Sequence, residues 1–155
     1  MKRRIPQSGD HWFQCAVRYL ARFDRTAAQV ERFLTRKGAS SAQAKQILGR
    51  LSTLRYLDDR AYAARWIEAT LARRPMAVER LKSELLARGL SESVAGEMIR
   101  KSMEEVDEEA LARRAVFLQS RQGSRLLPQR VAGLLRRRGF AEDMIERIIR
   151  DCTQT

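Results

Sequence analysis

Short runs of arginine and lysine are the residues of this sequence that are best suited to bind an anion. They are Arg36-Lys37, Arg73-Arg74 and Arg136-Arg137-Arg138. Guanidinium and ammonium groups bind phosphate oxygens, so these side chains could contact a nucleic-acid backbone whatever its base sequence. All three runs also lie at or near the expected ends of helices, where the helix dipole favours basic side chains. That second explanation accounts for Arg36-Lys37 and for the arginine triplet about as well as phosphate binding does.

Only one pair of carboxylates, Asp58-Asp59, is a candidate for acid–base or metal chemistry. Two acidic residues at the expected start of a helix are more typical of an N-cap and a partner for the helix dipole. Nothing near them in sequence supplies further ligands, and the cysteines and the single histidine lack zinc-binding spacing. Neither a phosphate-binding glycine loop nor a nucleophile elbow is present. We therefore expect a protein that is not an enzyme, with no metal and no cofactor.

The positive charge of the chain is large and unevenly distributed. Lys and Arg outnumber Asp and Glu by 31 to 19, which gives a net charge of +12. Residues 1–57 carry 12 basic and 3 acidic side chains, residues 58–106 carry 9 of each, and residues 107–155 carry 10 and 7. The excess in the first third is larger than helix ends need, so it favours phosphate contacts with single- or double-stranded DNA. The balanced middle third favours a contact with protein.

Three glycines mark a repeat in the chain that would position these charged groups. Gly38, Gly89 and Gly139 are 51 and 50 residues apart, and each follows a basic amphipathic segment with apolar residues four and eight positions earlier. Such a period indicates stacked repeats, each of which buries its apolar face against its neighbours. A glycine just after a helix is typical of a left-handed turn, after which the next residue packs back onto the helix.

Apolar residues at intervals of three and four, without an alternating pattern, predict an all-α protein with three helices in each repeat. The expected helix starts are at Asp10, Thr26, Ser40 or Ser41, Asp58, Pro75, Ser91, Asp107 and Pro128. We divide the chain into a basic N-terminal tail (1–9), repeat 1 (10–53), repeat 2 (54–104) and repeat 3 (105–155), which form an elongated, curved array. No apolar run is long enough to span a membrane, and we expect a monomer in the cytoplasm.

The most specific motif of the sequence lies in the second repeat. It contains Tyr56, Asp58, Asp59, Tyr62 and Ala63, and an Arg88-Gly89-Leu90 turn follows downstream. This arrangement resembles the RecX family of recombination regulators, whose members are tandem three-helix repeats, and the resemblance covers nearly the whole chain. Roles as helix caps and core residues explain all the motif residues, including Gly89.

The sequence also departs from the RecX pattern at three places. Arg55 stands where the family commonly has glycine, the segment from Arg73 to Met76 lacks the usual glycine, and Ala39 replaces a larger apolar residue. These departures affect turns and their contacts, so they leave the resemblance in place but alter the details of the surface.

The resemblance implies a non-enzymatic regulator of homologous recombination and DNA repair, within the SOS response, that binds RecA filaments on DNA. It further implies that the protein lies in the helical groove of the filament and inhibits the ATPase activity and strand exchange of RecA. The candidate contacts with DNA or with the filament are the seven basic residues of the three runs: Arg36, Lys37, Arg73, Arg74, Arg136, Arg137 and Arg138.

Two alternatives stay open from the sequence. A general DNA-binding helical module, architectural or transcriptional, would also carry a net charge of +12 and a repeated helix–glycine–helix pattern. The segments after the three glycines begin with small or acidic residues rather than the Asn, Gln or Arg typical of base-reading helices, so base-specific reading is its weaker form. The second alternative is a scaffold for an acidic protein, with no nucleic acid.

Overall fold

The computed structural model describes residues 9–121 and 126–153, and every regular element in them is an α-helix. The nine helices of these residues are α1 (Gly9–Arg22), α2 (Ala27–Lys37), α3 (Ser41–Thr53), α4 (Asp59–Arg73), α5 (Val78–Ala87), α6 (Glu92–Ser102), α7 (Glu108–Ser120), α8 (Pro128–Arg137) and α9 (Glu142–Thr153). The prediction of an all-α protein is confirmed. The predicted basic tail lies outside the described residues except for Gly9, which begins α1.

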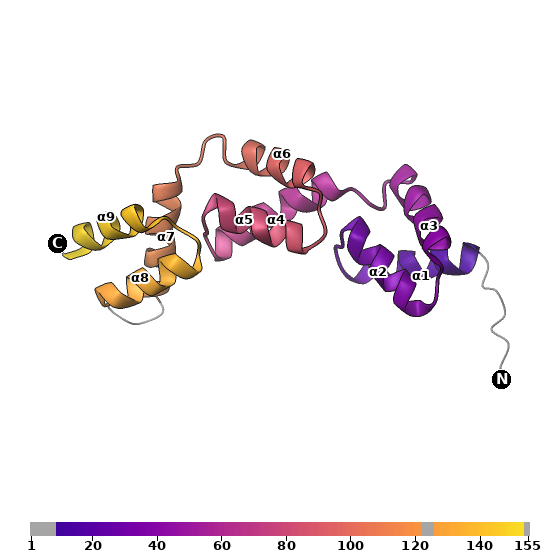
Figure 1. The fold of residues 1–155 in the computed structure, drawn as a ribbon, viewed down its shortest axis with the longest axis horizontal. Helices are drawn as coiled ribbons and strands as arrows, with labels where there is room; N and C mark the ends of the chain where they lie inside the picture. The colour runs from indigo at the N-terminus through magenta and orange to yellow at the C-terminus, as the bar shows by residue number, and fades with distance from the viewer. Residues whose placement is uncertain (1–8, 122–125, 154–155) are drawn as a thin grey trace.

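The helices follow one another in groups of three along an elongated arch, with α1 and α9 at opposite ends (Figure 1). We call α1–α3, α4–α6 and α7–α9 units 1, 2 and 3. The most extensively packed helix pairs, such as α4 with α6 and α8 with α9, lie within a unit. The predicted array of three three-helix repeats is therefore confirmed. The predicted boundaries after residues 53 and 104 fall between the units and stay a prediction.

Each unit has its own cluster of buried apolar side chains. Leu34, Leu85 and Leu135, the residues four positions before the three glycines, are fully buried, each in a different cluster. A few contacts cross between units 2 and 3, since Ala77 of unit 2 belongs to the cluster of unit 3. The prediction that each repeat buries its apolar face against its neighbours is thus wrong for most of the core, because the helices of one unit supply most of the residues of its cluster.

Side chains cap most helices where the sequence predicts. Thr26 and Ser40 each form a capping box, and the side chains of Asp58, Ser91 and Asp107 accept hydrogen bonds from first-turn N–H groups. These groups have no partner inside the helix, so each cap stabilises the helix end by about 1 kcal/mol. The predicted helix starts at these five places are confirmed, with Ser40 rather than Ser41 as the N-cap of α3.

Two predicted helix starts are wrong. Asp10 lies in the first turn of α1 rather than at its N-cap. The helix predicted at Pro75 begins instead at Val78, and its N-cap residue, Ala77, has no side-chain cap. The reason is that the following unit binds this end of α5: the N–H of Ala77 donates to the carbonyl of Arg138 at 2.9 Å. Pro75 has no N–H and lies before this contact, outside the helix.

The three repeat glycines adopt the predicted left-handed conformation, with φ of 110° at Gly38, 88° at Gly89 and 82° at Gly139. The N–H of the residue after each glycine donates to the carbonyl five positions back, as for Phe140 and Leu135 at 3.1 Å. The N–H of each glycine donates to the carbonyl three positions back, so each turn is a Schellman motif. The residues after the glycines, Ala39, Leu90 and Phe140, are all buried.

Arg55 is the one non-glycine residue with positive φ among the described residues, at 60°. It lies in the connection between α3 and α4, where the resemblance leads one to expect glycine. A side chain in this conformation places its Cβ against the following carbonyl, at a cost of about 1–2 kcal/mol. At this departure from the family pattern, arginine therefore occupies a position whose backbone conformation favours glycine.

Candidate nucleic-acid interface

The two aspartates of the motif cap two different helices. Asp58 is the N-cap of its own helix, α4, and its carboxylate accepts from the N–H of Ala61 at 3.0 Å. Asp59 points the other way, and its carboxylate accepts from the N–H of Ala27 at 2.9 Å. Ala27 is the first residue of α2 in the preceding unit. One aspartate thus begins unit 2 and the next one binds unit 1 to it.

The junction between units 2 and 3 repeats this arrangement. Asp107 caps its own helix, α7, and Glu108 accepts from the N–H of Val78, the first residue of α5, at 2.9 Å. A second contact also recurs: the backbone carbonyl of the residue before Gly89 or Gly139 accepts from the N-cap residue of the middle helix in the preceding unit. The Arg88 carbonyl accepts from the Thr26 hydroxyl at 2.7 Å, and the Arg138 carbonyl accepts from the N–H of Ala77 at 2.9 Å. The two junctions therefore use equivalent positions, although the donor is a side-chain hydroxyl in one and a backbone N–H in the other.

The remaining motif residues divide between core and surface. Tyr62 and Ala63 are buried in the core of unit 2, and the Gly89 turn packs against Ala28 of unit 1. Tyr56 is 54% exposed, and its ring contacts Phe13 edge-on with centroids 6.4 Å apart. A core role for Tyr56 is thus wrong, because the turn at Arg55 places this side chain on the surface.

Arginines from units 2 and 3 meet in a pocket of about 460 Å³, which we call the junction pocket. Its lining residues are Arg74, Met76, Arg80, Glu84, Arg136, Arg137 and Arg138. The end of α4 and the helix α5 supply one wall, and the end of α8 supplies the other. The contact between Ala77 and the Arg138 carbonyl holds these walls together. Five guanidinium groups and one carboxylate therefore share the pocket.

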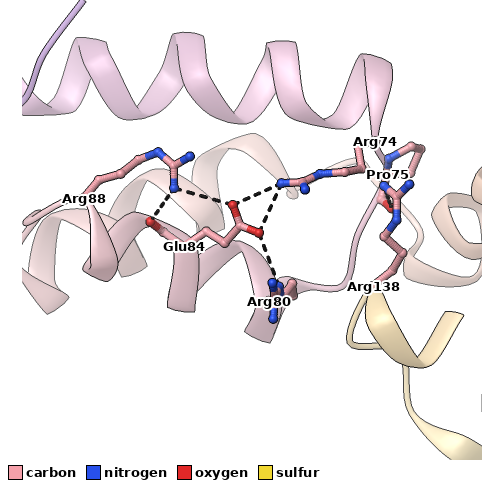
Figure 2. A network of polar contacts seen from close by, with 6 residues as sticks. All are labelled: Arg74, Pro75, Arg80, Glu84, Arg88 and Arg138. Carbon is pink, nitrogen blue, oxygen red and sulfur yellow. Dashed lines mark hydrogen bonds and ion pairs between the residues drawn. The ribbon is translucent and has the colours of Figure 1, made fainter. Parts of the chain in front are cut away.

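Glu84 lies at the centre of a group of three arginines (Figure 2). One nitrogen of Arg74 donates to both of its carboxylate oxygens at 3.1 Å, and the Nε of Arg80 donates at 3.3 Å. Arg88 approaches to 3.5 Å and also donates to the Glu84 backbone carbonyl. The Arg88 guanidinium lies over the ring of Trp66, 4.5 Å from its centroid. Glu84 is therefore bound from several sides, with its side chain 15% exposed.

Arg138 enters the pocket from unit 3 and has a different environment. Its guanidinium reaches the Arg74–Pro75 segment and donates to the Pro75 carbonyl at 3.4 Å (Figure 2). In the part of the chain that the structure describes, no carboxylate forms an ion pair with it. Burial lowers the pKa of Arg138 from its usual value, and the nearby charges of Arg74 and Arg137 lower it further. The positive charge of Arg138 is thus only partly compensated.

The other candidate contacts lie outside this pocket or at its rim. Arg136 is exposed and forms an ion pair with Glu142, which raises the pKa of its guanidinium. Arg73 is exposed at the last residue of α4, outside the pocket lining. Arg36 and Lys37 are exposed at the end of α2 in unit 1. The structure therefore brings together Arg74 and the arginine triplet, but not the whole predicted set.

Sequence reasoning missed Arg80, Glu84 and Arg88 as parts of this site. Arg80 and Glu84 lie in α5 and Arg88 lies just after it, at intervals of four residues, so they share one side of the helix. That spacing is visible in the sequence, but on its own it is typical of an ordinary solvated face. Their relation to Arg138 is not visible there, because 50 or more residues separate them from it.

Other kinds of site find less support in the residues described. No three His, Cys, Asp or Glu side chains among them are grouped so that they could hold a metal ion. None of the described helices is both long and apolar enough to cross a membrane.

Fold and surface together define the class of this molecule: an all-helical protein of three tandem three-helix repeats with an arginine-rich pocket between two of them. The family described as "RecX, first three-helix domain" matches residues 13–51. "Regulatory protein RecX" of Trichlorobacter lovleyi is 32% identical over 144 residues, which cover 88% of this chain and 92% of that protein. This chain belongs to the RecX family of regulatory proteins.

Further relatives and solved structures agree with this membership. "Regulatory protein RecX" of Thermus thermophilus is 41% identical over 97 residues, 63% of this chain and 64% of that protein. The crystal structure of RecX from Lactobacillus salivarius matches with a TM-score of 0.70 and 20% identity, covering 95% of this chain and 97% of that one. At that identity the structural match supports the fold alone.

Proposed function

We propose that this protein is a non-enzymatic regulator of homologous recombination and DNA repair that binds RecA filaments on DNA. In this proposal it inhibits the ATPase activity and strand exchange of RecA. The observation that carries the proposal is membership of the RecX family, through a relative of similar length named as a regulatory protein. The SOS response is the setting in which such a regulator would act, and the protein would work as a monomer in the cytoplasm.

The shape and the charges of the molecule support this proposal. An elongated arch of repeats presents surfaces in a row rather than one enclosed site, which suits a groove on a filament (Figure 1). Exposed basic residues at the end of α2 and around the junction pocket are available for phosphates of single- or double-stranded DNA. The proposed contacts are Arg36, Lys37, Arg73, Arg74, Arg136, Arg137 and Arg138.

The proposal is tested by measuring the ATPase rate of RecA on single-stranded DNA while this protein is added. Inhibition is expected well below one copy per RecA subunit. A variant with Arg136, Arg137 and Arg138 changed to Ala should need about tenfold more protein for the same inhibition, because it loses charge-assisted contacts. The matched control changes Arg114, Arg121 and Arg147 to Ala, three exposed arginines of the same unit outside the junction pocket.

Absence of inhibition at stoichiometric excess would contradict the proposal. If the protein still bound DNA, the general DNA-binding module would become the better assignment. If it bound neither RecA nor DNA at low salt, a scaffold for an acidic protein would be favoured. If the triple variant and its control lost inhibitory potency equally, the junction pocket would not be a specific contact. The proposed inhibitory function would still stand.

A further inference from the structure

We propose that the junction pocket binds one phosphate group of a DNA backbone, and that Glu84 occupies this place as an internal competitor when DNA is absent. The inference rests on the proposed function in one respect, namely that the protein contacts DNA. It goes further by naming one site, by adding Arg80 to the predicted contacts and by giving the single carboxylate of the pocket lining a role.

The charge of the pocket is the first step of the argument. Five arginines line it against one carboxylate, that of Glu84, and one of the five, Arg136, is paired with Glu142 outside the lining. Arg74 and Arg80 already donate to Glu84, whereas the hydrogen bond of Arg138 in the described part of the chain goes to the neutral Pro75 carbonyl. Because Arg138 is partly buried, water screens its repulsion from Arg74 less than it would between two fully exposed side chains. A bound anion between these two side chains would relieve that repulsion.

The chemistry of the donors favours a phosphate. Arginine presents several N–H groups in a plane and matches the oxygens of a phosphate with two parallel hydrogen bonds. All the cations of the pocket lining are arginines, and they approach from two units. The bonds that Arg74 and Arg80 make to Glu84 show that their guanidinium groups can surround an oxyanion. A phosphate oxygen would replace a carboxylate oxygen without a change in donor type.

The surroundings of the pocket favour a phosphate in a polymer over a free ion. Exposed Arg136 and Arg137 lie at the rim, and exposed Arg73 lies next to Arg74 in sequence. These side chains would contact neighbouring phosphates along a strand. Because Arg74 and Arg138 come from different units, a phosphate held by both would also join unit 2 to unit 3.

Three variants test this inference through binding of a fluorescein-labelled oligothymidylate, followed by anisotropy between about 50 and 200 mM salt. Arg138→Met keeps the buried stem but removes the charge, so affinity should fall about tenfold at low salt. The slope of log affinity against log salt should decrease by about 0.7, the value for one lost phosphate contact on a single strand. Arg80→Met should act in the same direction, and it removes an exposed side chain, so its fold is at little risk.

Glu84→Gln should change the affinity for DNA in the opposite direction, so it is the more diagnostic variant. It keeps the size of the side chain but removes the competing charge, so DNA should bind several-fold more tightly. The matched control, Arg100→Met, removes one charge from an exposed position on α6, outside the pocket lining, and should leave the slope within experimental error. Unchanged melting temperatures would establish that each variant is folded.

The outcomes separate failure of this inference from failure of the proposed function. If Arg138→Met and Glu84→Gln both left the affinity and the salt slope unchanged, the phosphate site would be overturned. If these variants still inhibited the ATPase activity of RecA, the proposed regulatory function would stand. If the variants bound DNA normally but no longer bound RecA filaments, the pocket would be assigned to a carboxylate of a protein partner. That result would also overturn the phosphate site. If the unaltered protein failed to bind the oligonucleotide at low salt, both this inference and the proposed DNA contact would fall.

Discussion

A side chain at position 89 would be unfavourable for two reasons, and both concern the Cβ atom that glycine lacks. The φ of Gly89 is 88° and lies in the left-handed region, where a side chain is strained. A Cβ at this position would also lie 2.4 Å from the Cβ of Ala28 in unit 1. Gly139 has the same relation to unit 2, with a Cβ 2.8 Å from that of Arg80. Each glycine therefore serves both the turn of its own unit and the approach of its neighbour.

We predict that Gly89→Ala lowers the free energy of unfolding by about 3 kcal/mol, through backbone strain together with the clash against Ala28. Urea denaturation followed by circular dichroism would measure the loss. Gly96→Ala is the matched control, because Gly96 lies within α6 and a Cβ there meets nothing within 4 Å. That variant should be about 1 kcal/mol more stable than the unaltered protein. A loss below about 1 kcal/mol for Gly89→Ala would contradict the close approach of the two units.

Helix ends are the means by which the units are joined. The first N–H groups of a helix lack partners within it, and here a carboxylate of the following unit accepts from one of them. Asp59 does so for α2 and Glu108 does so for α5. The joint is thus a cap that comes from another unit, so the helix start and the junction are stabilised together.

We predict that Asp59→Ala and Asp58→Ala each destabilise the protein by about 1–2 kcal/mol but expose different amide protons. Asp59→Ala should speed hydrogen exchange at Ala27, in the preceding unit, and leave Ala61 protected. Asp58→Ala should do the reverse, because its carboxylate binds Ala61. Exchange measured by NMR distinguishes the two. If both variants exposed the same amides, the division of roles between these aspartates would be wrong.

The sequence predicts contacts that act over a few residues and misses those made across units. Thr26, Ser40 and Ser91 cap helices that start at the next residue, so their role follows from local chemistry. The predicted start of α5 at Pro75 is wrong because unit 3 supplies the partners of the true start: the Arg138 carbonyl binds the N–H of Ala77, and Glu108 binds that of Val78. The pocket around Glu84 could not be predicted from the sequence either, because Arg138 reaches it from another unit. Periodicity predicts repeats, but it does not give the contacts between them.

Three separate cores make the whole molecule a row of partly independent units. Buried apolar clusters stabilise each unit from within, and polar caps and a few shared residues join it to the next. Stability in such a chain is approximately a sum of unit and junction contributions. Opening of one end is therefore expected to leave the opposite end folded.

We predict that Leu135→Ala destabilises unit 3 by about 3 kcal/mol and leaves unit 1 protected, because a cavity forms in one core only. Leu34→Ala, at the equivalent place in unit 1, should give the mirror result. Both leucines are fully buried. Hydrogen exchange compared between α1–α3 and α7–α9 measures the effect. Equal loss of protection at both ends in either variant would show that the protein unfolds as one cooperative body instead.

Unit 3 lacks the N–H donor through which units 1 and 2 bind the unit that follows, because α8 begins with Pro128. In units 1 and 2 the first residue of the middle helix, Ala27 or Val78, donates its N–H to a carboxylate of the unit that follows. The equivalent first residue of α8 is Pro128, which has no N–H to offer, and Leu127 before it provides no side-chain cap. A second copy that docked onto unit 3 as unit 3 docks onto unit 2 would lack one of the two polar contacts of that joint, because Pro128 has no N–H for the carboxylate. Head-to-tail fibres built on this joint are thereby disfavoured by a single imino acid.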